Sequence, residues 1–222
     1  MELGVSEPTG GYQIANPQFA SAEDWKNNAC LNYSDAPMWL YISGYKKSGD
    51  LLARHVVETG CDQDDLVYPI AFLYRQYIEL QLKDIIKESR IVLSEDSGFP
   101  KHHKIQHLWD VSEQLMRKII ATVDSSAGEY ITADDFSFIG SAIKSFVEID
   151  PESMVFRYPE DKNGNSSIES LPHINIRNLA DQISELETRL KKFNLAVSFI
   201  RDWQQQSMRV RAVGRIRDSN PP

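Results

Sequence analysis

Hydrophobic residues recur along most of this chain at the three- and four-residue spacing of an α-helix rather than at the two-residue spacing of a strand. The pattern predicts five main helices, at about 34–58, 66–91, 106–123, 132–149 and 178–205. Glycine and proline interrupt the pattern between helices, as in the loop that contains Gly98 and Pro100. We therefore expect an all-α fold, an antiparallel helical bundle with an irregular N-terminal arm and a turn-rich loop before the last helix.

Residues at the ends of these segments support the predicted boundaries. Residues 34–37 place oxygen-bearing side chains before a proline, which is typical of a helix start. Asp62 to Asp65 can cap the second helix, with Pro69 expected in its first turn, where a missing N–H has no cost. Thr132 and Asp135 have the spacing of a capping box and predict the start of the fourth helix.

The second predicted helix carries two apolar stripes instead of one. Two stripes indicate a central helix that packs on more than one side. The first stripe is Leu66, Ile70, Leu73, Tyr77 and Leu80, and the second is Val67, Ala71, Tyr74, Ile78, Leu82 and Ile85.

The last predicted helix has a heptad-like apolar stripe, which can lie on the bundle or pair with a second chain. Four arginines follow it, at positions 209, 211, 215 and 217. We divide the chain accordingly into an N-terminal arm at 1–33, a helical-bundle domain at 34–205 and a basic C-terminal tail at 206–222.

The amino-acid composition limits the classes of protein to which this chain can belong. Of the 222 residues, 41% are hydrophobic and 25% are charged, which is enough apolar material for a core. Apolar runs are too short to cross a bilayer and no secretory signal is visible, so we expect a cytoplasmic protein that does not enter the membrane. A net charge of −8 disfavours broad binding to polyanions but allows a local basic patch.

Several common site signatures are missing from the sequence. Cys30 and Cys61 have no CxxC partner, so neither a disulfide framework nor a zinc site is expected. No GxxxxGK[ST], GxGxxG, GxSxG or HExxH motif occurs. We expect neither a cofactor nor a metal.

Arg75, Glu79 and Lys83 occur four residues apart and form one column on the second predicted helix. One interpretation is a solvated edge with two weak ion pairs. The other is that the column faces a cleft, where Arg75 and Lys83 bind a phosphate and Glu79 orients them. The sequence leaves both interpretations open.

Two further residues are candidates for the same site. His103 precedes the third predicted helix and is either a general base or acid or a histidine packed at the helix start. Arg157 lies between two aromatic residues and is either an anion ligand or the partner of a carboxylate such as Asp150 or Glu79. The candidate catalytic residues are Arg75, His103 and Arg157, and the candidate phosphate ligands are Arg75, Lys83 and Arg157.

Three segments carry a family resemblance: LVYPIAFLYRQYIELQLK at 66–83, HKIQHLW at 103–109 and DPESMVFRYP at 150–159. Together they resemble a group of bacterial HEPN-like proteins, a helix-bundle superfamily associated with nucleotide and RNA chemistry. The resemblance covers roughly residues 41–158. It implies a homodimeric bundle that acts on RNA or a nucleotide in a stress, toxin–antitoxin or phage-defence module, with a protein partner encoded nearby.

Active members of that superfamily cleave RNA without a metal, using an arginine and a histidine separated by four to six residues. No arginine of this chain is followed by a histidine at that spacing, so the ribonuclease motif does not carry over. The expected function is RNA or nucleotide recognition, with RNA cleavage if Arg75, His103 and Arg157 meet in space. The alternative is a non-enzymatic protein-interaction or dimerisation module in which the polar cluster is structural.

Overall fold

The structure is a computed structural model that describes residues 18, 20–31, 38–96, 98–122, 130–161, 163–168 and 171–218. The chain forms two units, residues 1–37 and 38–222. In the first unit the described residues contain one 3-10 helix, Trp25–Asn27. The helix start predicted at 34–37 lies outside the described residues.

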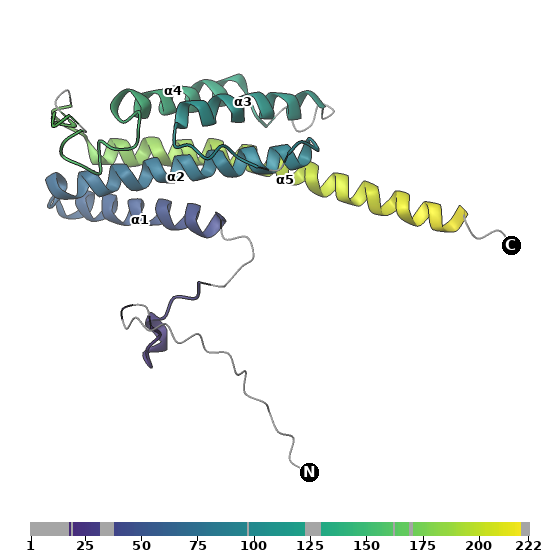
Figure 1. Cartoon of the computed structure of the whole chain (residues 1–222), viewed down its shortest axis with the longest axis horizontal. Coiled ribbons are helices and arrows are strands. Elements are labelled where there is room, and N and C mark those ends of the chain that lie inside the picture. Colours follow the sequence, from purple (N-terminus) through teal and green to yellow (C-terminus); the bar gives the residue numbers. More distant parts are fainter. Residues whose placement is uncertain are drawn as a thin grey trace, which may run out of the picture. The chain divides into compact units, whose positions relative to one another are not determined.

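The second unit is a helical bundle, and no strand occurs among its described residues, so the all-α prediction is confirmed. Figure 1 shows α2 and α5 lying between α1 on one side and the α3–α4 pair on the other. The five α-helices of the described residues are α1 (Met38–Thr59), α2 (Gln63–Val92), α3 (Ile105–Thr122), α4 (Ala133–Ile149) and α5 (Ile176–Asp218).

Helix α2 occupies the centre of this unit, where it packs against α1, α3 and α5. Ile70, Ile78, Leu82 and Ile85 are fully buried along it. Buried positions occur in both apolar stripes, as expected for a helix that packs on more than one side. Charged residues of α2 that fall between the stripes are carried into the interior with them.

Helices α1 and α2 approach each other closely at Gly49. A Cβ atom at this position would lie 2.7 Å from Tyr74 Cε1, so no larger residue fits without a shift. The hydroxyl of Tyr74 donates a 3.0 Å hydrogen bond to Asp50 Oδ1, and its pKa is raised by burial and by the charge of Asp50. Asp50 also pairs with Lys46, four residues earlier on α1, at 2.7 Å.

The helix starts follow the sequence signals in one case and depart from them in another. Thr132 and Asp135 form the predicted capping box at the start of α4. Asp62 precedes α2 with φ of 63° and makes no side-chain capping bond. The prediction that Pro69 lies in the first turn is wrong, because α2 begins at Gln63, three residues earlier than expected.

Helix α5 is longer than predicted. It was expected to end near residue 205 and instead runs to Asp218, through the segment that carries the four arginines. Gln204 Nε2 donates to the carbonyl oxygen of Val92, the last residue of α2, and α5 then continues past that end (Figure 1). Within the described residues, no helix combines the length and the apolar character needed to cross a membrane.

Candidate functional site

Arg75 lies in the interior of the bundle, at a point where three segments meet. Its side chain has no exposed surface. Nε lies 3.3 Å from both the backbone oxygen and Oδ2 of Asp150, and Nη2 donates to the backbone oxygen of His103 at 3.1 Å. The guanidinium therefore joins α2 to the end of α4 and to the loop before α3.

Glu79 is the second buried charge of this cluster and is 1% exposed. Its Oε2 lies 3.5 Å from Arg75 Nη1, and its Oε1 accepts a 2.8 Å hydrogen bond from Lys83 Nζ. The same Oε1 lies 2.8 Å from Nδ1 of His103. The predicted column of Arg75, Glu79 and Lys83 thus exists as a chain of ion pairs, and it faces the interior rather than solvent.

The charges within this cluster cancel. Arg75 and Lys83 supply two positive charges, and Glu79 and Asp150 supply two negative charges. Burial lowers the pKa of Arg75, and the charges of Asp150 and Glu79 oppose that shift. A buried guanidinium needs such partners, because an unpaired ion in the interior costs several kcal/mol.

Asp150 also holds the loop that follows α4. Its Oδ1 accepts hydrogen bonds from the backbone N–H groups of Met154 at 2.7 Å and Val155 at 3.1 Å. Since Oδ2 faces Arg75, one carboxylate connects the loop to the centre of α2. The next residue of this loop, Phe156, is buried.

Arg157 lies on the same loop but is exposed. Its Nε donates to the backbone oxygen of Ser153 at 2.6 Å, and its guanidinium lies 5.8 Å from the ring centroid of Phe72 and 5.7 Å from that of Tyr158. The guanidinium thus lies near two aromatic rings, whereas neither proposed carboxylate partner, Asp150 or Glu79, makes an ion pair with it in the described residues. Arg157 reaches Arg75 only through space, where its charge lowers the pKa of Arg75 further.

His103 is the accessible member of the cluster. Its side chain is 68% exposed although Nδ1 contacts the buried carboxylate of Glu79. The neighbouring His102 and His107 contact each other, with 2.9 Å between Nε2 and Nδ1. Burial and the neighbouring His107 lower the pKa of His102. Within the described residues no three His, Cys, Asp or Glu side chains form a group that could hold a metal ion.

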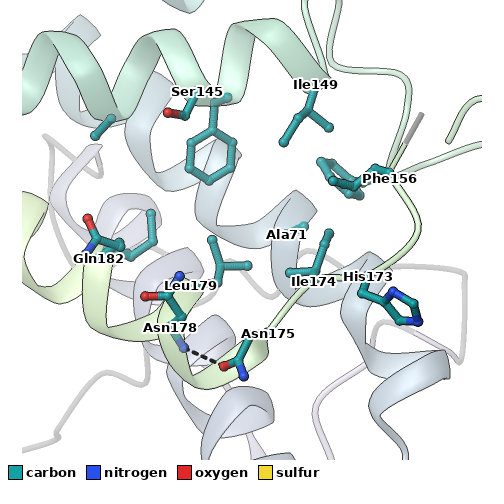
Figure 2. Close-up of a pocket in the computed structure, with 14 residues that line it drawn as sticks. Ala71, Ser145, Ile149, Phe156, His173, Ile174, Asn175, Asn178, Leu179 and Gln182 are labelled. Atoms are coloured by element: carbon teal, nitrogen blue, oxygen red, sulfur yellow. Dashed lines mark hydrogen bonds between the residues drawn. The ribbon is translucent and has the colours of Figure 1, made fainter.

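A separate apolar pocket lies where α4, the start of α5 and the 150–158 loop approach α2 (Figure 2). Its volume is about 350 Å³. Phe156 forms one wall, and the polar side chains of Asn178 and Gln182 on α5 lie at its edge. Among the described residues that line it none is Asp, Glu, Lys or Arg, and His173 lies at its edge beside Asn175.

Comparison of this chain with protein families, with curated proteins and with solved structures finds no match. The case for a function is therefore made on the geometry of the polar cluster and of the apolar pocket.

The structure brings together some of the candidate residues and separates others. Arg75, Glu79, Lys83 and His103 form one contact network, whereas Arg157 has its own partners. Sequence reasoning missed the pocket, because its lining comes from α2, α4, α5 and a loop that are far apart along the chain. The one available signal was Phe156, a buried aromatic residue inside a turn-rich segment.

Proposed function

We propose that this protein is a non-enzymatic protein-interaction module in which the charged cluster is structural. The observation that carries the proposal is the environment of Arg75, a fully buried guanidinium paired with Asp150 and Glu79. A phosphate ligand would have to displace two carboxylates from the interior of the bundle. That exchange removes buried ion pairs and is unfavourable.

The cluster has a structural task that explains its burial. Arg75 and Asp150 hold the start of the 150–158 loop, and this loop carries Phe156 into the wall of the apolar pocket. The pocket depends on the cluster in this arrangement, because a loop released from Asp150 no longer positions the aromatic ring. The buried ion pairs then influence partner binding indirectly, because they hold the loop that shapes the apolar pocket.

The pocket suits an uncharged apolar side chain of a partner protein. The described residues of its lining include no Lys, Arg, Asp or Glu, while the amides of Asn178 and Gln182 can each donate to and accept from a peptide backbone. An apolar anchor inside a pocket with a polar edge is the usual arrangement of a protein–protein contact.

A second candidate function is RNA cleavage by a HEPN-like protein with an unconventional site. The observation that favours it is His103, whose exposed imidazole has Nδ1 against the carboxylate of Glu79. A carboxylate in that place orients a histidine for general-base work, with Nε2 left to take a proton from a ribose hydroxyl. Arg157, exposed on the neighbouring loop, would then stabilise charge on the phosphate.

One assay separates the two candidates. Purified protein is incubated with total bacterial RNA in EDTA, beside the variants Arg75→Ala, His103→Ala and Arg157→Ala, each checked for helicity by circular dichroism. We expect no cleavage by the parent and a loss of thermal stability confined to Arg75→Ala. Cleavage that disappears in folded His103→Ala would overturn the interaction proposal in favour of the nuclease.

The pocket is tested with Nile red, a neutral apolar dye whose fluorescence rises in apolar sites. Ser145→Trp places a large side chain at the pocket, and Glu148→Trp, exposed on the same helix and outside the lining, is the matched control. We expect Ser145→Trp to lower the fluorescence and Glu148→Trp to leave it unchanged. Equal fluorescence from all three proteins would show that the pocket binds no apolar group.

A further inference from the structure

A polar cleft lies between α1, α2 and α5. Helix α1 supplies one wall, between Trp39 and Arg54, α2 supplies a second, between Tyr77 and Asp84, and α5 supplies a third. The volume of the cleft is about 520 Å³, within the range of about 300–1,000 Å³ that is usual for small-molecule sites. None of the described residues that line it belongs to the polar cluster or to the apolar pocket.

Three polar side chains of α2 line this cleft in a row, namely Tyr77, Gln81 and Asp84. Their i, i+4, i+7 spacing places them on one face of the helix. Tyr77 is 2% exposed and Gln81 6% exposed. In the part of the chain that the structure describes, Gln81 Nε2 has no hydrogen-bond partner and the Tyr77 hydroxyl makes no hydrogen bond. Because buried polar groups are nearly always hydrogen-bonded, this row has the character of a binding surface.

Asp84, the third member of the row, is a half-buried carboxylate without a counter-ion. No described residue forms an ion pair or a hydrogen bond with its side chain. Burial raises the pKa of Asp84, the charge of Glu88 raises it further, and Lys87 opposes the shift less strongly. A ligand with an amine would therefore supply the positive charge that this carboxylate lacks.

The wall that α1 supplies is basic. Lys46 is already paired, with Asp50 at 2.7 Å and with Glu187 of α5 at 3.3 Å. Lys47 and Arg54 also line the cleft, but both are exposed, and neither forms an ion pair with a described residue. The cleft thus has an unpaired carboxylate on the α2 wall and two unpaired cations on the α1 wall. This distribution favours a ligand that carries both an amine and a carboxylate.

The length of the α2 row indicates the size of the ligand. Tyr77 and Asp84 are separated along the helix by about 10 Å, at 1.5 Å per residue. A hydrogen bond of about 3 Å at each end leaves about 4–5 Å between the outer polar groups of the ligand. A free amino acid has its amine and carboxylate on one carbon and is too short, whereas an extended dipeptide spans up to about 7 Å. Gln81, between the two ends, can donate to and accept from a peptide bond.

We propose that this cleft binds a dipeptide with apolar side chains. The amine of the dipeptide pairs with Asp84 and its peptide bond with Gln81, while its carboxylate lies between the Tyr77 hydroxyl and the cations of α1. Apolar side chains are favoured because Trp39 and Leu51, which line the cleft, are each 51% exposed. The inference does not rest on the proposed function, because the cleft shares no residue with the apolar pocket.

The first test is isothermal titration calorimetry of the full chain with the dipeptide Leu-Phe. N-acetyl-Leu-Phe, which has no amine, and Leu-Phe amide, which has no carboxylate, should each bind about tenfold more weakly. Asp84→Asn should lower the affinity for Leu-Phe by the same factor and leave that for N-acetyl-Leu-Phe unchanged. Asp65→Asn, exposed on the same helix and outside the cleft, is the matched control and should bind like the parent.

Two results of this titration would overturn the proposal. One is a dissociation constant for Leu-Phe above about 1 mM, because the cleft would then have no useful affinity for the dipeptide. The other is equal affinity for Leu-Phe and Leu-Phe amide, because the N-terminus of a longer chain would then be sufficient and a free dipeptide would not be the ligand.

The second test locates the site. Ser43→Trp places a large side chain in the cleft and should abolish binding of Leu-Phe, whereas Ser48→Trp, exposed on the same helix and outside the lining, should not. Gln81→Met removes a buried donor that has no partner, so thermal stability should not fall, while affinity for Leu-Phe should fall about fivefold. A Gln81→Met variant that loses stability but binds Leu-Phe like the parent would show that Gln81 is structural and contradict the proposal.

Discussion

The polar cluster around Arg75 and the part of α5 that carries Leu195, Phe199 and Trp203 reverse the usual placement of residues. In the cluster, charged side chains are buried and paired, whereas these three large apolar side chains of α5 are exposed. Buried pairs are costly to break, and exposed apolar rows gain free energy when another surface covers them. The comparison teaches that the charged or apolar character of a residue does not by itself tell whether the residue holds the bundle together or faces solvent.

Removing the arginine is the change with the largest expected effect. Arg75→Ala leaves Asp150 and Glu79 as buried carboxylates without their guanidinium, so we expect a loss of about 3–5 kcal/mol in the free energy of unfolding. Urea denaturation followed by circular dichroism measures it. Arg157→Ala, the exposed control, should change it by about 0–1 kcal/mol. Equal losses from the two variants would show that the buried arginine contributes no more to stability than the exposed one.

The packing of α1 against α2 beside the cluster gives a second test of how buried contacts stabilise the bundle. Gly49→Ala places a methyl group against the ring of Tyr74, the residue before Arg75, and should cost about 1–3 kcal/mol of stability. Gly44→Ala on the same helix has open space around it and should instead stabilise the protein by about 0.5–1 kcal/mol. Thermal unfolding of both variants gives the sign of each change.

A third buried carboxylate, Asp135, leads to a prediction about the pH dependence of stability. Burial raises the pKa of Asp135, but hydrogen bonds from Lys192 and Thr132 outweigh burial and lower it below its usual value. The ionised form therefore stabilises the fold above the unfolded pKa of about 3.9, and this contribution is lost as pH falls through the folded pKa. Asp135→Asn should cost about 1–2 kcal/mol at neutral pH, where it removes a cap and an ion pair.

Urea denaturation of the parent and Asp135→Asn at a series of pH values checks this expectation. The difference between the two proteins should shrink as pH falls from about 3.9 through the lower pKa of folded Asp135, below which both proteins carry a neutral side chain at this position. A difference that stays constant down to the acid transition would mean that the charge of Asp135 is unimportant.

The smallest effect on stability is expected at the exposed apolar residues of α5. At low protein concentration, Phe199→Ser should change the free energy of unfolding by no more than about 0.5 kcal/mol. Phe193→Ser, six residues earlier on the same helix and fully buried, is the matched control and should be strongly destabilising. Similar losses of stability from both variants would show that Phe199 helps to hold the bundle together.

Local signals explain how much of the fold was predictable. Helical spacing and the Thr132–Asp135 capping box depend on neighbouring residues, and they located α4 within a residue. The end of α5 was missed because Gln204–Gln206 interrupts the apolar stripe. Glutamine and arginine are good helix formers, which is consistent with the continuation of the helix to Asp218.

The candidate site was predictable only in part, for the same reason. The column of Arg75, Glu79 and Lys83 follows from i, i+4 spacing and forms as expected. Its burial could not be predicted, because it depends on Asp150 and on the backbone of His103, which reach Arg75 only when α3 and α4 are in place. Long-range contacts of this kind leave no periodic signal in a sequence.

The long sequence separations within the Arg75 contacts have a consequence for the order of folding. Arg75 bonds to residues 28 and 75 positions further along the chain, so these contacts close large loops and form only after neighbouring helices have docked. We expect the contacts of the Arg75 guanidinium to form late in folding and not to be part of the folding nucleus. In a chevron plot, its loss would raise the unfolding rate and leave the folding rate nearly unchanged.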